Sequence, residues 1–206
     1  SGGRVFVADG VMGMAALDCR MRPCDPTDGY DAGVVGLPQG LAARGDRLYV
    51  ADGRSGLRIV DVGDPQHPRG IARVATSSWP TDVAVEGDHA FLALAFGYRA
   101  EGGQTRAYGG VEAVVVVGPG APVLGGSAGD TCHAGSVAVD GVRAVAGCWR
   151  RGNIYGGTAV GLLTVDVARP RSPREQALLS DVGEVSDVAL VGETAYVTGL
   201  EPGLWM

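Results

Sequence analysis

Two of the four cysteines, Cys132 and Cys148, flank a predicted hairpin and are spaced to form a disulfide bond. If Val139 faces Arg143 across the turn, positions whose numbers add to about 282 lie opposite each other in an antiparallel ladder. The two sulfurs then fall on neighbouring ladder positions. A bond here would restrict the unfolded chain and stabilise the fold by roughly 3 kcal/mol. We therefore predict a Cys132–Cys148 disulfide.

The other two cysteines, Cys19 and Cys24, lie close together at the end of one predicted strand and in the turn that follows it. We predict a second, local disulfide between them. Two alternatives stay open: buried free thiols, and a metal site formed by Cys132, His133 and Cys148. The metal site has no CxxC pair and no visible fourth ligand, both of which are typical of structural zinc sites.

Three aspartates, Asp25, Asp28 and Asp31, are spaced around a glycine in the segment DPTDGYD. Carboxylate oxygens on a glycine turn could hold Ca²⁺. The spacing is not that of the EF-hand loop, and no glutamate closes it. Because aspartate and glycine are also ordinary turn residues, we expect a plain turn with no cofactor. Calcium binding is the alternative.

Composition and missing motifs exclude several functions. All 17 basic residues are arginine, so a lysine nucleophile, Schiff base or P-loop lysine is excluded. The net charge of −6 argues against a general nucleic-acid binder. No apolar run approaches the roughly 18–20 residues of a membrane helix. No GxSxG, HExxH, P-loop or dinucleotide motif is present, so the sequence offers no catalytic residue.

Internal repeats define the elements that position these residues. Residues 47–68 read RLYVADGRSGLRIVDVGDPQHP, and parts of this pattern return at 4–18 and 162–173. A second element of the VAVEGD type precedes the repeat. Its turn glycine recurs at intervals of 42, 54 and 51 residues, at Gly45, Gly87, Gly141 and Gly192.

Each repeat unit reads as four short strands, named A to D, joined by tight turns. Strand A is of the VAVEGD type, strand B of the HAFLAL type, strand C of the LRIVDV type and strand D of the GIARVATS type. No window of ten or more residues has a helical apolar period. Four-stranded units of about 40–45 residues are typical of β-propeller blades, which stack around an axis. We predict an all-β propeller of four-stranded antiparallel blades.

The repeats form a single β-propeller domain or a fragment of one. Its approximate units are 4–40, 41–82, 83–136, 137–187 and a partial unit 188–206. With about 17 strands, the chain reads as about four blades plus a partial one. We expect it to be part of a larger propeller, completed by a missing segment or by another chain. The alternative is a four-bladed ring in which residues 187–191 complete the first blade.

The stretch YVADGRSGLRIVDVGDPQHP, residues 49–68, resembles the LVIVD repeat, which is found in extracytoplasmic propeller proteins. The resemblance is closest in 41–68 and 162–197, good at 4–18 and loose at 89–122. It implies a propeller fold and a secreted, periplasmic or cell-surface location, and paired cysteines agree with such an oxidising compartment. The family has no agreed catalytic motif.

The longest predicted loops fall on one face of the propeller. D–A and B–C connections emerge on this face, and we call it the long-loop face. Two B–C connections carry the insertions AFGYRAEGGQTRAYGG and GCWRRGNIYGGTAVG. His133 precedes a strand A and should lie at the mouth of the central channel. The candidate binding residues are Trp79, Phe96, Tyr98, Arg99, Arg106, Tyr108, His133, Trp149, Arg150, Arg151 and Tyr155.

Aromatic and arginine side chains are the types that anchor interfaces. We therefore predict a non-enzymatic extracytoplasmic binding or scaffold module that takes a protein, peptide or glycan at the long-loop face. It would bind no nucleic acid and span no membrane. The first alternative is a lactonase- or esterase-like propeller hydrolase with a metal or His133 at the channel mouth. The second is a structural subunit of a surface assembly. In a third, the loop rings only pack against one another.

Overall fold

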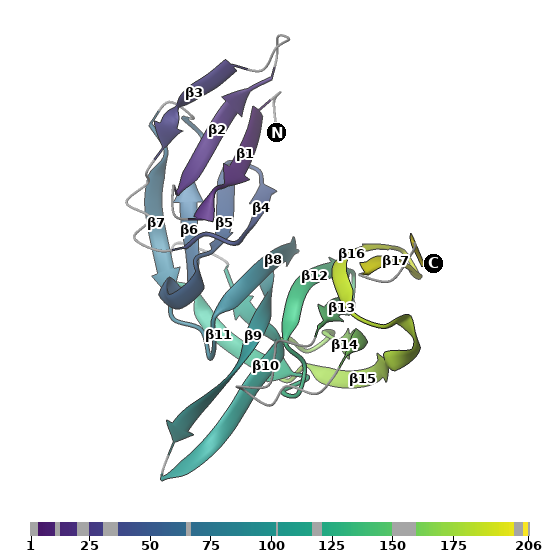
Figure 1. Ribbon diagram of the computed structural model, residues 1–206. Coiled ribbons are helices and arrows are strands. Elements are labelled where there is room, and N and C mark those ends of the chain that lie inside the picture. The colour runs from purple at the N-terminus through teal and green to yellow at the C-terminus, as the bar shows by residue number, and fades with distance from the viewer. Residues whose placement is uncertain are drawn as a thin grey trace.

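Consecutive strands of the chain pair into five antiparallel sheets (Figure 1). The computed structural model describes residues 4–10, 13–19, 25–30, 37–64, 67–101, 103–116, 121–149, 160–199 and 204–205. The first sheet contains β1 (Arg4–Ala8), β2 (Met14–Asp18) and β3 (Asp25–Tyr30). The second contains β4 (Gly40–Arg44), β5 (Arg47–Ala51), β6 (Leu57–Asp61) and β7 (Arg69–Val74).

The remaining three sheets follow the same order. The third contains β8 (Pro80–Glu86), β9 (His89–Glu101), β10 (Gln104–Val115) and β11 (Val123–Ala128). The fourth contains β12 (Ala134–Asp140), β13 (Arg143–Cys148), β14 (Gly161–Asp166) and β15 (Arg174–Leu179). The fifth contains β16 (Val185–Val191), β17 (Thr194–Gly199) and β18 (Leu204–Trp205). Helical structure in the described residues is limited to two 3₁₀ turns, η2 (Gly53–Ser55) and η3 (Ser180–Val182).

The A–B hairpins close through the repeated glycines. In the second sheet Arg44 pairs with Arg47, which leaves a two-residue turn that begins with Gly45. The four repeated turn glycines have φ values of 52° to 59°, while no described residue other than glycine has a positive φ. Glycine at the first turn position suits the type II′ turn, which matches the twist of the flanking strands. The predicted hairpins are thereby confirmed.

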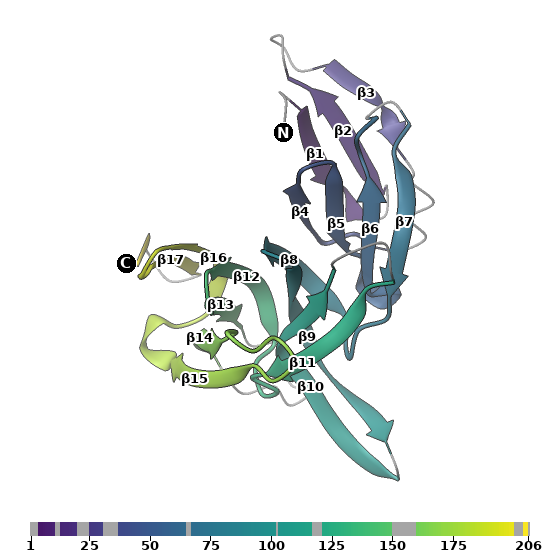
Figure 2. The same ribbon diagram turned by 180° about the vertical axis from the view of Figure 1, so that it is seen from behind.

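Successive sheets pack face to face along an arc, with their first strands β4, β8, β12 and β16 along its inner side (Figures 1 and 2). Each pair of neighbouring sheets encloses its own apolar core. Tyr49 and Leu57 meet Leu92 and Val114 between the second and third sheets. Phe91 is among the residues that meet the fourth sheet. Both faces of an inner sheet are therefore buried, and the predicted all-β propeller blades are confirmed.

Side chains also join the inner strands β8 and β12. The Asp82 carboxylate Oδ2 accepts a hydrogen bond from the Val137 backbone N–H at 2.9 Å. The Thr81 hydroxyl donates to the Ala134 carbonyl at 2.7 Å. Such links fix one blade against the next, which the backbone ladders within each sheet do not do.

The four-bladed closure is not the observed topology. Residues 187–191 belong to β16, which pairs with β17 in the fifth sheet. The first sheet is a separate sheet of β1, β2 and β3 in the described residues. The inner strand at 187–191 therefore does not complete the first blade.

The expected turn at DPTDGYD is corrected, because residues 25–30 form strand β3. Its residues pair with β2, with Asp25 opposite Asp18 and Pro26 opposite Leu17. β3 is the outer strand of its sheet, and an edge strand tolerates proline and polar residues that a central strand excludes. Asp31 lies outside the described residues. Among the described residues, no group of three or more His, Cys, Asp or Glu side chains could hold a metal ion.

Candidate functional site

The first long insertion is a hairpin and not an irregular loop. Strands β9 and β10 continue to pair as far as Glu101 and Gln104, and Arg99 lies opposite Arg106. The paired strands project away from the body of the protein (Figures 1 and 2). The backbones of the predicted binding residues on this insertion all lie on the hairpin, namely Phe96, Tyr98, Arg99, Arg106 and Tyr108. The sequence pair Gly102–Gly103 is a hairpin signal that could have predicted this.

Trp79 forms the clearest exposed aromatic contact of the long-loop face. Its side chain is 46% exposed. The guanidinium carbon of Arg54 lies 4.5 Å from the centroid of its ring, which is a cation–π contact. Arg54 lies in η2, the B–C connection of the second sheet, and Trp79 in the D–A connection before β8. Arg54 was not among the predicted residues, although its B–C loop position was a signal for it.

The loop that carries Trp79 is held at several points. The Ser77 backbone N–H donates to the Glu112 carboxylate at 3.1 Å, and the Ser77 hydroxyl donates to its other oxygen. Glu112 is buried. The Ser78 hydroxyl donates to the Ala95 carbonyl at 2.6 Å, and the Ala95 N–H donates to the Trp79 carbonyl at 2.8 Å. These bonds fix the backbone beneath the exposed ring before any ligand arrives.

The loop that carries Arg54 is anchored by a buried carboxylate. Asp52 is fully buried, and its Oδ2 lies 3.3 Å from Nε of Arg58. Burial raises the pKa of Asp52, and the charges of Arg58 and Arg73 oppose this effect. The Asp52 carbonyl also accepts from the Ser55 N–H at 2.8 Å. The aspartate of the repeated Asp-Gly pair is therefore structural, because it positions η2 and with it Arg54.

His133 does not present its ring at a channel mouth. Its side chain is 3% exposed and packs edge-on against Trp149, with ring centroids 4.7 Å apart. The Trp149 backbone N–H donates to the His133 carbonyl at 3.2 Å. A β-carbon at Gly135 would lie only 2.5 Å from Nε1 of Trp149, so the indole covers this glycine. The sequence predicts His133 directly before a strand A, and it does precede the inner strand β12, but its side chain is buried.

The predicted Cys132–Cys148 disulfide is confirmed, with its Cα atoms 5.3 Å apart. It links the segment before β12 to the end of β13, beside His133 and Trp149. Cys19 is also disulfide-bonded, while its predicted partner Cys24 lies outside the described residues. Three further predicted binding residues also lie outside them, namely Arg150, Arg151 and Tyr155.

Comparisons with solved structures agree with this architecture. The computationally designed Ika4 protein aligns at a TM-score of 0.56 and 10% identity, over 83% of this chain and 90% of its own. PorZ, a surface component of the type-IX secretion system of Porphyromonas gingivalis, aligns at a TM-score of 0.55 and 17% identity, over 99% of this chain and 23% of its own. Apo AztD from Citrobacter koseri aligns at a TM-score of 0.52 and 12% identity, over 97% of this chain and 54% of its own. At these identities the likeness concerns the fold alone.

Fold and repeats together define a β-propeller-type repeat protein. Residues 36–76, which include β4 to β7, match the LVIVD repeat. The resemblance read from the sequence is thus confirmed by that match. No curated protein sequence matches the chain. No helix among the described residues is long and apolar enough to cross a membrane.

Proposed function

We propose that the protein is a non-enzymatic binding module that takes a protein, peptide or glycan at the long-loop face. The observation that carries the proposal is the Arg54–Trp79 pair, an exposed ring under a guanidinium on a loop held by hydrogen bonds to Glu112 and Ala95. An exposed, pre-positioned aromatic loses little conformational freedom when it is covered. Tryptophan and arginine are also the residues most enriched among interface hot spots.

The proposed location is extracytoplasmic. The Cys132–Cys148 disulfide supports it, because such bonds persist in oxidising compartments and are rare in the cytosol. We do not propose a hydrolase. His133, the residue named for that alternative, is buried against Trp149 and offers no ring to a substrate.

Binding at this face is tested with variants on beads. Wild-type protein, Trp79→Ala and Ile71→Ala are immobilised and exposed to an envelope extract of the source organism and to a glycan array. Ile71 is a matched control, because it is 42% exposed and lies on β7, away from the D–A loop. Loss of a hot-spot ring weakens binding by about tenfold or more.

We expect Trp79→Ala to lose a partner or glycan that both wild type and Ile71→Ala retain. Retention of every bound species by Trp79→Ala would overturn the proposal. A thermal midpoint of Trp79→Ala close to that of wild type shows that any loss comes from the contact surface and not from unfolding.

A further inference from the structure

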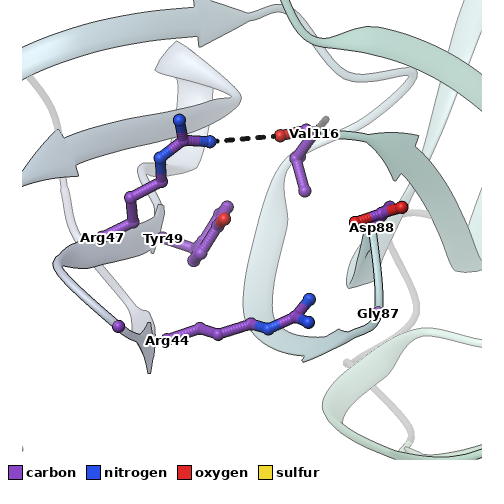
Figure 3. A pocket seen from close by; sticks show the side chains of 7 residues that line it. Arg44, Arg47, Tyr49, Gly87, Asp88 and Val116 are labelled. Carbon is purple, nitrogen blue, oxygen red and sulfur yellow. Dashed lines mark hydrogen bonds between the residues drawn. The ribbon is translucent and has the colours of Figure 1, made fainter. Parts of the chain in front are cut away.

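A pocket opens on the face opposite the long-loop face, between the A–B turns of the second and third sheets (Figure 3). Its volume is about 390 Å³, a size typical of small-molecule sites. Arg44 and Arg47 flank Tyr49 on one side, and the turn that holds Asp88 lies on the other (Figure 3). Two cations and one carboxylate thus line the pocket, in a chain whose net charge is −6.

The donors in this pocket are largely unused. The Arg44 side chain makes no hydrogen bond or ion pair with another described residue. Arg47 donates one hydrogen bond, from Nη1 to the Val116 carbonyl at 3.4 Å, and a guanidinium carries five N–H donors. Tyr49 is almost fully buried, but its hydroxyl is not among the enclosed polar atoms, and it has no hydrogen-bond partner in the described part of the chain. The hydroxyl can therefore donate to a ligand in the pocket.

The equivalent junction between the fourth and fifth sheets is bridged by a hydrogen bond. There the Asp140 carboxylate accepts a hydrogen bond from the Gly192 N–H at 2.6 Å, which joins one A–B turn to the next. Arg44 occupies the position of Asp140 in the second sheet, directly before the turn glycine. A guanidinium cannot accept that bond. Arg44 instead extends its side chain towards the turn at Gly87 (Figure 3), and the junction stays open as a pocket.

We propose that this pocket binds an oxyanion, the carboxylate or phosphate group of a small ligand, between Arg44 and Arg47. Guanidinium groups bind both anions through paired N–H donors, and the Tyr49 hydroxyl supplies a further donor. Asp88 is the acidic side chain of the lining. We take the ligand to be an acidic sugar or a sugar phosphate, in which Asp88 accepts a hydrogen bond from a hydroxyl group next to the oxyanion. This site does not depend on the function proposed for the long-loop face.

The binding test uses three probes of similar size: glucuronate, glucose 6-phosphate and neutral glucose. Each is titrated against the ¹⁵N-labelled chain at constant ionic strength while the Gly45 and Gly87 amide resonances are followed. We expect a saturable shift with at least one of the two acids and none with glucose. Saturation by glucuronate assigns the carboxylate, and saturation by glucose 6-phosphate assigns the phosphate. Saturation by neither acid, or by glucose to the same extent, would overturn the proposal.

Variants locate the binding. Arg44→Gln and Arg47→Gln should each weaken it by about tenfold, since each removes a charge-assisted contact. Arg143→Gln is the matched control, because Arg143 has the position of Arg47 in the fourth sheet and does not line the pocket. An equal loss in Arg143→Gln would show a general charge effect and refute the site. Arg47→Lys keeps the positive charge at this position. It is the control for a loss of binding that is caused by misfolding.

Discussion

The Asp82 carboxylate and the Val137 backbone N–H, 2.9 Å apart, form a hydrogen bond between the inner strands of two adjacent sheets. Burial raises the pKa of Asp82, the hydrogen bonds from Val137 and Val83 lower it, and the Asp187 carboxylate raises it further. The net direction is upward. The link between the sheets thus uses a carboxyl group that holds its proton more tightly in the folded state than in the unfolded chain.

Stability should therefore depend on pH through Asp82. A raised pKa gives a contribution that is complete below the unfolded pKa and is lost as pH rises through the folded pKa. Asparagine can still accept the Val137 bond but does not titrate. Urea unfolding from about pH 7 to about pH 4 should show wild type gaining stability relative to Asp82→Asn as the pH falls. Asp187→Asn, which removes the neighbouring charge, should reduce this gain. If the difference in unfolding free energy between wild type and Asp82→Asn does not change with pH, the prediction is contradicted.

The Cys132–Cys148 bond should contribute measurably to stability. The double variant Cys132→Ala/Cys148→Ala, which keeps the bond at Cys19, should lose about 3 kcal/mol of unfolding free energy. Urea unfolding under non-reducing conditions measures it. The same variant should change little on addition of a reductant compared with wild type. An unchanged urea midpoint would show that the bond does not restrict the unfolded chain.

Gly110 should tolerate no side chain. It has φ +68°, and a β-carbon there would lie 2.1 Å from the Ala128 carbonyl oxygen. We expect Gly110→Ala to lower the free energy of unfolding by roughly 3 kcal/mol or more. Gly103, at the hairpin tip, also has positive φ but nothing within 4 Å of a built β-carbon. Gly103→Ala should therefore cost only about 1–2 kcal/mol of backbone strain. Similar losses in both variants, by thermal unfolding, would argue against the steric clash.

The Asp140–Gly192 hydrogen bond should stabilise the junction of the last two sheets. Asp140→Ala should cost about 1 kcal/mol. Glu86 has the equivalent position in the third sheet, and its side chain forms no hydrogen bond with a described residue. Glu86→Ala should therefore stay within about 0.5 kcal/mol of wild type. Equal effects of the two substitutions on the urea midpoint would deny the bond this role.

Local pattern was enough to predict the hairpins and the disulfide, although the ladder register was wrong by one. Asp140, and not Val139, pairs with Arg143, because the turn has two residues. A bulge between Ala134 and Ser136 then shifts the ladder back by one position, and Ala134 lies opposite Cys148. The disulfide prediction succeeded because a bulge compensated for the register error, and bulges leave little signal in a single sequence.

Other features depend on contacts between distant segments. Arg54 and Trp79 come from different connections, so their stacking follows from how two sheets pack. The strand at 25–30 is rich in turn residues, and its pairing with β2 overrides that local preference. The pocket at Arg44 depends on the gap between two turns, which no spacing within one repeat specifies.

The projecting hairpin has a consequence for amide hydrogen exchange. Beyond the sheet, the β9 and β10 backbones pair with no other described strand than each other, from Gly97 opposite Tyr108 to Glu101 opposite Gln104. In a two-stranded antiparallel ribbon, every second N–H points outward without a partner strand. Protection should therefore alternate along each strand of the ribbon, with slow and fast amides in turn. Within the third sheet, where both strands have neighbours on each side, protection should be continuous.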